Sequence, residues 1–273
     1  MEGEEKMAEK KNELTFGGSL KRDLAEVKGA LPKDFNSDRF VQNAVALLNG
    51  NTTLQEYAKK NGTAQIKANM MKAAYLGLDF MSSEAHLVPY GSTLNFMIDY
   101  RGAEKLVKKY SIKPVDSIYS FIVREGDSFE ATIKDNEPCI NFIPKPFNDG
   151  KVVGACAYIK FKDNTIQYDT MSLKELENTR NHSKAKNSPA WTSFTLEMYR
   201  KTILHRLCKH VTLDFENAQQ IQTFNSDMEI ETDVKKVAEA DIQANANKES
   251  LEDTDVVEVV VETDGQTSFV TEE

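Results

Sequence analysis

The sequence predicts an α+β protein with a mainly antiparallel sheet between helical segments. Three observations carry this prediction. Residues 37–77 place apolar side chains at helical spacing, residues 85–170 form short β segments separated by turn residues, and residues 190–211 return to helical spacing. Helices before and after a run of strands are typical of the α+β class.

Four helices are predicted before the first strand, each opened by a Ser or Thr that can cap it. Their expected starts are Ser19, Ser37, Thr53 and Thr63. Pro32 ends the first of these helices because proline cannot continue a helix, and the last ends near Gly77.

Seven β segments are predicted in the middle of the chain. They are residues 85–90, 94–98, 116–124, 129–134, 139–143, 152–162 and 165–170. Gly91-Ser92 and Asp163-Asn164 each separate two of these segments and are typical of tight hairpin turns. Asp99 is expected to cap a helix over residues 100–110.

Helical patterns return after the last strand. Residues 172–179 form a short helix, and Ser188 with Pro189 supplies a cap and a first-turn proline for a long helix over residues 190–211. Residues 213–224 are compatible with one more helix.

The formal charge of −9 is unevenly distributed. Residues 1–226 hold 31 basic and 28 acidic side chains, a net of +3, whereas residues 227–273 hold 3 and 15, a net of −12. We therefore expect an N-terminal helical arm over residues 1–35 that serves oligomerisation, a core over 36–226, and an acidic, largely disordered tail over 227–273.

Several function classes lack their sequence signals. No run of about 18 apolar residues predicts a membrane helix, and the charged N-terminus does not resemble a signal peptide. The 3 cysteines form no CxxC pair, and no Walker loop is present. We expect a cytoplasmic protein that requires no cofactor, with magnesium allowed as a counterion.

The long helix over residues 190–211 has two distinct faces when residues are placed at steps of 100°. The apolar face holds Leu196, Ile203, Leu207 and Val211. The second face holds Trp191, Phe194, Met198, Lys201, His205 and Lys209. Aromatic rings can stack on unpaired bases while cations follow the phosphates, so this face predicts single-strand binding. The alternative is that the rings are core residues and the cations a solvated face.

The flanking sequence adds positive charge. Residues 172–210 carry 8 basic and 3 acidic side chains, a net of +5, and Lys184 lies in a basic loop over residues 180–186. These cations belong either to a nucleic-acid surface or to an ordinary solvated one.

A second basic stripe occurs on the helix over residues 100–110. It consists of Arg101, Lys105 and Lys108, with Lys109 adjoining. Gly102 lies inside this helix, where a close backbone approach, to DNA or to another helix, would explain it. Lys67 and Lys72 on an earlier helix are weaker candidates, and a solvated surface is the open alternative for all of them.

Four motifs in order resemble the RecT family of phage and prophage recombinases, which anneal single-stranded DNA. They are residues 87–90, 96–102, 188–191 and 197–202. The resemblance covers roughly residues 36–224 and leaves the acidic tail outside. It implies antiparallel β-hairpins and a small sheet backed by a long helix, flanked by additional helices.

The resemblance also implies a function without catalysis. Members anneal complementary strands without ATP and assemble into rings or helical filaments, after a partner exonuclease has exposed a single strand. The DNA groove would fall on Arg101, Lys105, Trp191, Arg200, Lys201, His205 and Arg206. The tail would dock an exonuclease or a host single-strand-binding protein, act as a solubilising spacer, or compete with DNA for the groove.

Three alternatives stay open on sequence grounds. A passive single-strand coating protein would need the same groove as an annealing protein. A metal-dependent nuclease would need carboxylates in a ligand motif, and none is recognisable here. An adaptor would use the basic face for a protein partner instead of DNA.

Overall fold

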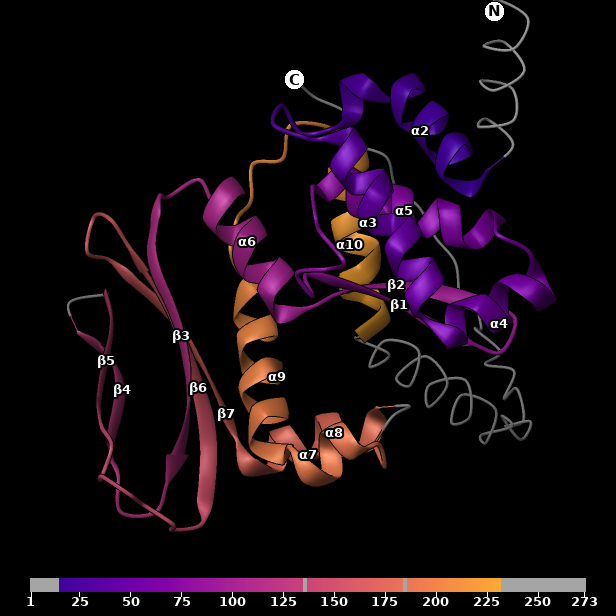
Figure 1. Cartoon of the computed structure of the whole chain (residues 1–273). Coiled ribbons are helices and arrows are strands. Elements are labelled where there is room, and N and C mark those ends of the chain that lie inside the picture. The colour runs from indigo at the N-terminus through magenta and orange to yellow at the C-terminus, as the bar shows by residue number, and fades with distance from the viewer. Residues whose placement is uncertain (1–14, 135–136, 184–185, 232–273) are drawn as a thin grey trace, which may run out of the picture. The chain divides into compact units, whose positions relative to one another are not determined.

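The computed structural model describes residues 15–134, 137–183 and 186–231, all within one compact unit that spans Met1–Thr232 (Figure 1). The α+β prediction is confirmed, because helices precede and follow a set of antiparallel strands. No helix in these described ranges is long and apolar enough to cross a membrane.

Helices precede the first strand, and side chains cap several of them. These helices are α2 (Phe16–Glu26), the 3-10 turn Lys28–Ala30, α3 (Ser37–Gly50), α4 (Thr52–Asn61) and α5 (Ala64–Leu76). The caps of the first three helices are Thr15, Asn36 and Asn51, whose side-chain oxygens accept backbone N–H groups. The predicted caps Ser19 and Thr53 are therefore wrong, and both helices begin earlier.

Helix α2 is not separate from the rest of the described unit. It contacts α3 and α5, and Leu20 and Leu24 are fully buried in the common core. The described part of the predicted arm thus packs on the body. At the other end, α10 (Ala218–Glu231) continues past the predicted tail boundary, and residues 232–273 lie outside the described residues.

The first hairpin and the next helix form as predicted. Strands β1 (Ala85–Tyr90) and β2 (Thr93–Ile98) pair antiparallel around Gly91, whose φ is +63°. Asp99 then caps α6 (Tyr100–Tyr110), and its carboxylate accepts the N–H of Arg101 at 3.4 Å.

Gly102 is required by a close approach within the protein. A Cβ at this position would lie 2.1 Å from the backbone oxygen of Glu84, in the turn before β1. The sequence analysis expected this neighbour to be DNA or another helix, and the structure shows instead a turn of the same chain. Because glycine has no side chain, α6 can pack directly on the start of the hairpin.

The remaining strands form two layers (Figure 1). Strands β3 (Val115–Arg124), β6 (Val152–Phe161) and β7 (Ile166–Ser172) form a sheet in the order β3-β6-β7, and β4 (Ser128–Lys134) pairs with β5 (Glu137–Ile143). Helix α6 contacts the three-stranded sheet, as do α7 (Leu173–His182) and α9 (Thr195–Lys209). The β4–β5 hairpin packs on its other face, where the rings of Phe121 and Phe142 stack with centroids 4.3 Å apart.

The predicted long helix is interrupted. Ser172 forms a capping box with Glu175 and opens α7 (Leu173–His182), but residues 189–209 divide into α8 (Pro189–Ser193) and α9 (Thr195–Lys209). Phe194 separates the two with φ −123° and ψ 38°, outside the helical region. The single-helix prediction is therefore wrong at this residue.

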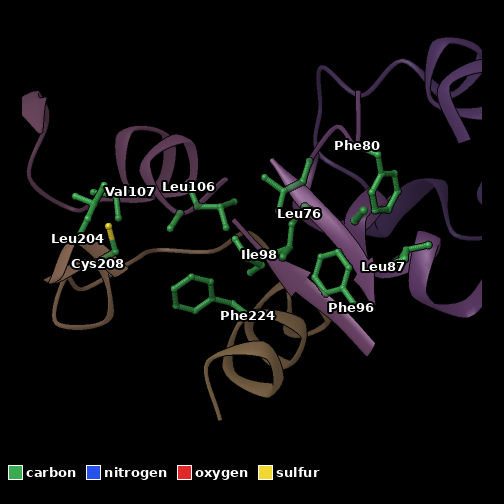
Figure 2. Close-up of a cluster of buried hydrophobic side chains, with 14 of the residues drawn as sticks. Leu76, Phe80, Leu87, Phe96, Ile98, Leu106, Val107, Leu204, Cys208 and Phe224 are labelled. Carbon is green, nitrogen blue, oxygen red and sulfur yellow. The ribbon is translucent and has the colours of Figure 1, made fainter. Parts of the chain in front are cut away.

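The core joins segments that are distant in the chain (Figure 2). Side chains of α5, of the β1–β2 hairpin and of α6, α9 and α10 meet in one buried cluster. Leu106 and Val107 of α6 pack toward Leu204 and Cys208 of α9. This packing fixes the two helices that carry most of the predicted site residues.

Candidate nucleic-acid interface

The outer face of α6 carries a shallow cavity lined by cations. Its volume is about 420 Å³, and its lining residues are Glu84, Arg101, Glu104, Lys105, Lys108 and Lys109. Four cations against two carboxylates leave this surface with a positive balance. We call it the α6 basic surface. An open, positive recess of this kind suits phosphate groups.

The four cations differ in how they are held. Lys105 is fixed by Glu84 at 2.6 Å and by the backbone oxygen of Gly77 at 2.8 Å, whereas Lys108 approaches Glu104 at 3.7 Å. Arg101 and Lys109 instead lie against the rings of Tyr100 and Tyr110, with their charged atoms 5.6 and 5.1 Å from the ring centroids. A phosphate that binds Lys105 or Lys108 would therefore compete with a carboxylate for the same ammonium group.

Asp99 connects this surface to α9 and to the hairpin. Its Oδ2 lies 3.0 Å from the Nζ of Lys201 and 3.4 Å from the Nε2 of His86. The Asp99 side chain is only 10% exposed, and that of Lys201 is 26% exposed. Lys201 is thus held beside the start of α6 by a largely buried ion pair.

The electrostatic balance at Asp99 favours its charged form. Burial alone would raise the pKa of this carboxyl. The hydrogen bond from His86, the charge and hydrogen bond of Lys201, and the N–H of Arg101 outweigh burial and lower the pKa from 3.8 to about 2. Asp99 is therefore ionised at neutral pH and retains Lys201 as its partner.

The other predicted cations of α9 are engaged elsewhere. Arg200 is exposed and pairs with Glu197 on its own helix at 2.8 Å. Arg206 pairs with Asp169 of β7 at 2.8 Å and with Glu175 of α7 at 3.4 Å. Arg206 therefore braces α9 against the sheet and α7.

Trp191 and His205 require a correction. They are only 4% and 3% exposed, respectively. His205 lies on α9, which is covered by the sheet and by α6, whereas Trp191 lies on α8, which packs against α9. The ring of Trp191 packs against Tyr199, with centroids 6.3 Å apart. In this conformation Trp191 is a core residue and cannot offer its ring to a base, whereas Phe194 is exposed.

The burial of Trp191 gives a spectroscopic prediction, since it is the only tryptophan. We expect tryptophan emission that iodide quenches poorly and that single-stranded DNA changes little, because neither reaches a buried ring. Titrations of the full chain with iodide and with poly-dT measure both effects. Strong quenching by poly-dT with unchanged protein fold would contradict the core assignment and return Trp191 to the DNA surface.

The remaining predicted residues are dispersed. Lys67 pairs with Asp23 at 2.7 Å and so fastens α5 to α2, while Lys72 and Lys209 are half-buried. Lys184 lies outside the described residues. The structure therefore gathers Arg101, Lys105 and Lys108 around one cavity and places Lys201 next to it through Asp99. The other predicted cations are not part of that group.

The sequence analysis did not predict several residues in and around the α6 basic surface. The carboxylate of Glu104 lies four positions before Lys108, a spacing that could have been read as a helical ion pair. Glu84 and His86 reach α6 only through tertiary packing, and no local pattern signals them. Among the described residues, no group of three or more His, Cys, Asp or Glu side chains is placed to hold a metal ion.

The clustered cations of α6 would suit phosphate groups, and the family match that follows assigns the molecule to the DNA-binding proteins. A sequence model of the RecT family matches residues 38–270. The chain belongs to the RecT family, whose members are single-strand annealing recombination proteins. The match includes the acidic tail, so the earlier expectation that the tail lies outside the resemblance is wrong.

A characterised relative supports the same assignment. The chain is similar to Protein RecT of Escherichia coli (strain K12), with 27% identity over 208 residues. The aligned region covers 72% of this chain and 74% of that protein.

Proposed function

We propose that this chain anneals complementary DNA strands without ATP, as an oligomer that holds one strand by its phosphates on the α6 basic surface. The single observation that carries the proposal is the convergence of Arg101, Lys105, Lys108 and Lys109 on one cavity. Contacts to phosphates position a strand without reading its sequence, which leaves the base edges free to pair.

Lys201 is the proposed link between this surface and α9. It lies at the start of α6 because Asp99 holds it there, so a strand on α6 would pass close to both helices. Arg200, which is exposed on the same helix, would extend the positive surface along α9. Arg206, Lys67 and the buried Trp191 and His205 are proposed to act through the fold that supports this surface.

The wider biological context is part of the same proposal. The protein would act in the cytoplasm on single strands exposed by a partner exonuclease, and it would meet a host single-strand-binding protein there. No covalent step and no nucleotide cofactor is assigned to it. The absence of a Walker loop from the sequence supports independence from ATP.

Ordered addition of two oligonucleotides tests annealing against passive coating. The full chain is first mixed with one strand and then with its complement. We expect a stable complex of the protein with the newly formed duplex. If the bound first strand is blocked from pairing, the protein only coats DNA and the annealing proposal fails.

A further inference from the structure

Phe147 stands in the loop over residues 144–151, between β5 and β6, in an unusual conformation. Its side chain is 102% exposed, and its φ is +52°. A bulky residue other than glycine adopts this left-handed region only where the surrounding structure holds it there. Both the exposed ring and its backbone conformation therefore need an explanation.

The loop around Phe147 is held by a network of hydrogen bonds. The carboxylate of Asp127 accepts the N–H groups of Arg124 at 2.8 Å and Lys145 at 3.0 Å, together with the Nδ2 of Asn148 at 2.7 Å. The guanidinium of Arg124 donates to the backbone oxygen of Gly150 at 2.7 Å. These bonds fix the loop on both sides of Phe147, so the ring is presented to solvent from a rigid support.

A pocket with a partly apolar lining lies at the opposite end of the same sheet. Its volume is about 570 Å³. Ile112, Phe161, Ile166 and Val211 belong to its apolar part, and polar residues such as Lys113, Glu137 and Gln167 form the rest of its wall. Ile112 is 65% exposed, so part of this apolar lining faces water.

The two features cannot meet within one copy of the chain. The loop of Phe147 is bonded to the end of the sheet where Arg124 pairs with Val152, whereas the pocket adjoins the end where Val115 pairs with Phe161. Strands of this length, at about 3.3 Å per residue, separate the two ends by roughly 30 Å. A ring at one end and a pocket at the other can pair only between copies.

We propose that copies of this chain join head to tail, with Phe147 of one copy entering the partly apolar pocket beside Ile112 of the next. Lys145 and Lys151 flank Phe147, and the pocket carries Glu137 together with Lys113, which pairs with Asp163 at 3.5 Å, so Glu137 can meet the two lysines. A contact between two different surfaces repeats from copy to copy and yields rings or helical filaments. This interface would account for the oligomer of the proposed function, and the inference rests on that proposed function.

Two single variants and their mixture test the pairing. Phe147→Asp removes the ring and Ile112→Asp spoils the pocket, and both positions are exposed, so the fold should persist in thermal unfolding. In sedimentation velocity with the full chain, alone and with an oligo-dT that spans one copy, we expect each variant to remain monomeric. A 1:1 mixture should form dimers and nothing larger, because only one intact ring and one intact pocket remain per pair.

Matched controls separate the interface from general effects of charge. Ile221→Asp introduces the same acid at an exposed isoleucine of α10 and should assemble like the unmodified chain. Phe147→Leu keeps an apolar side chain and should assemble at least partly. A short oligo-dT that spans one copy should bind both interface variants normally, so loss of assembly is distinguished from loss of DNA binding.

Four results would overturn the proposal. The first two are normal assembly of either Asp variant and a mixture that stays monomeric. The third is an unmodified chain that is monomeric both alone and with the short oligo-dT. The fourth is loss of short oligo-dT binding by Phe147→Asp with assembly intact. The last result would instead assign Phe147 to stacking on DNA bases.

Discussion

Replacing Arg101, Lys108 and Lys109 together by glutamine is expected to weaken single-strand binding by about two decades at 0.1 M salt. Each phosphate contact to a single strand contributes about 0.7 to the slope of log affinity against log salt concentration. Three lost contacts therefore reduce this slope by about 2. Lys105 is left in place because its bonds to Glu84 and Gly77 hold α6 on the turn before β1.

The slope is the decisive measurement for this variant. Fluorescence anisotropy with poly-dT and with a mixed-sequence strand, over a range of salt concentrations, should give the same reduction for both. The control replaces Arg22, Lys28 and Lys33, which are exposed cations of the same types outside α6. Equal reductions for the two triple variants would show that only total charge matters, and the α6 basic surface would lose its assignment.

Replacing Asp99 by asparagine is expected to destabilise the protein by about 2 kcal/mol at pH 7. Asparagine can still cap α6, so the change removes mainly the charge. A fall in pKa from 3.8 to about 2 corresponds to about 2 kcal/mol, at about 1.4 kcal/mol for each tenfold change in acid dissociation. The Asp99 carboxyl is largely buried, so solvent screens this contribution little.

The pH dependence of this effect has a definite sign. Because folding lowers the pKa of Asp99, its contribution is complete above the ordinary pKa of 3.8 and is lost as pH falls through about 2. Denaturant unfolding should therefore show the full difference at pH 7, a smaller one at pH 3 and almost none near pH 2. Asp163→Asn, at an exposed turn carboxylate, is the control and should change stability little. A difference between the Asp99 variant and the unmodified chain that persists undiminished at pH 2 would contradict the ion-pair explanation.

Local sequence signals predicted the elements that depend on neighbouring residues. Asp99 as a cap and the turns at Gly91 and Asn164 involve contacts within a few positions of the chain. The predicted ends of β1 and α6 are therefore correct, and β2 begins one residue earlier than predicted, at Thr93. Competing caps explain the errors in α2 and α4, where Thr15 and Asn51 open the helices ahead of Ser19 and Thr53.

Long-range packing explains what the sequence did not reveal. Strand β3 pairs with β6 and not with β4, the next strand in the sequence, and no turn residue predicts this arrangement. Trp191 and His205 share a face of the predicted single helix, yet packing of α8 against α9 buries Trp191, and packing of α9 against the sheet and α6 buries His205. The carboxylates that restrain Lys105 and Lys201 likewise come from distant segments.

The contact between Gly102 and Glu84 has a mechanical consequence. The same backbone oxygen of Glu84 that excludes a side chain at Gly102 also accepts the N–H of Asp99 at 3.0 Å. The start of the β1–β2 hairpin and the first turn of α6 thus share one anchor point without any compressible side chain between them. We therefore expect the hairpin and the first turn of α6 to move together, so a displacement of the hairpin at Gly91 would also move Arg101.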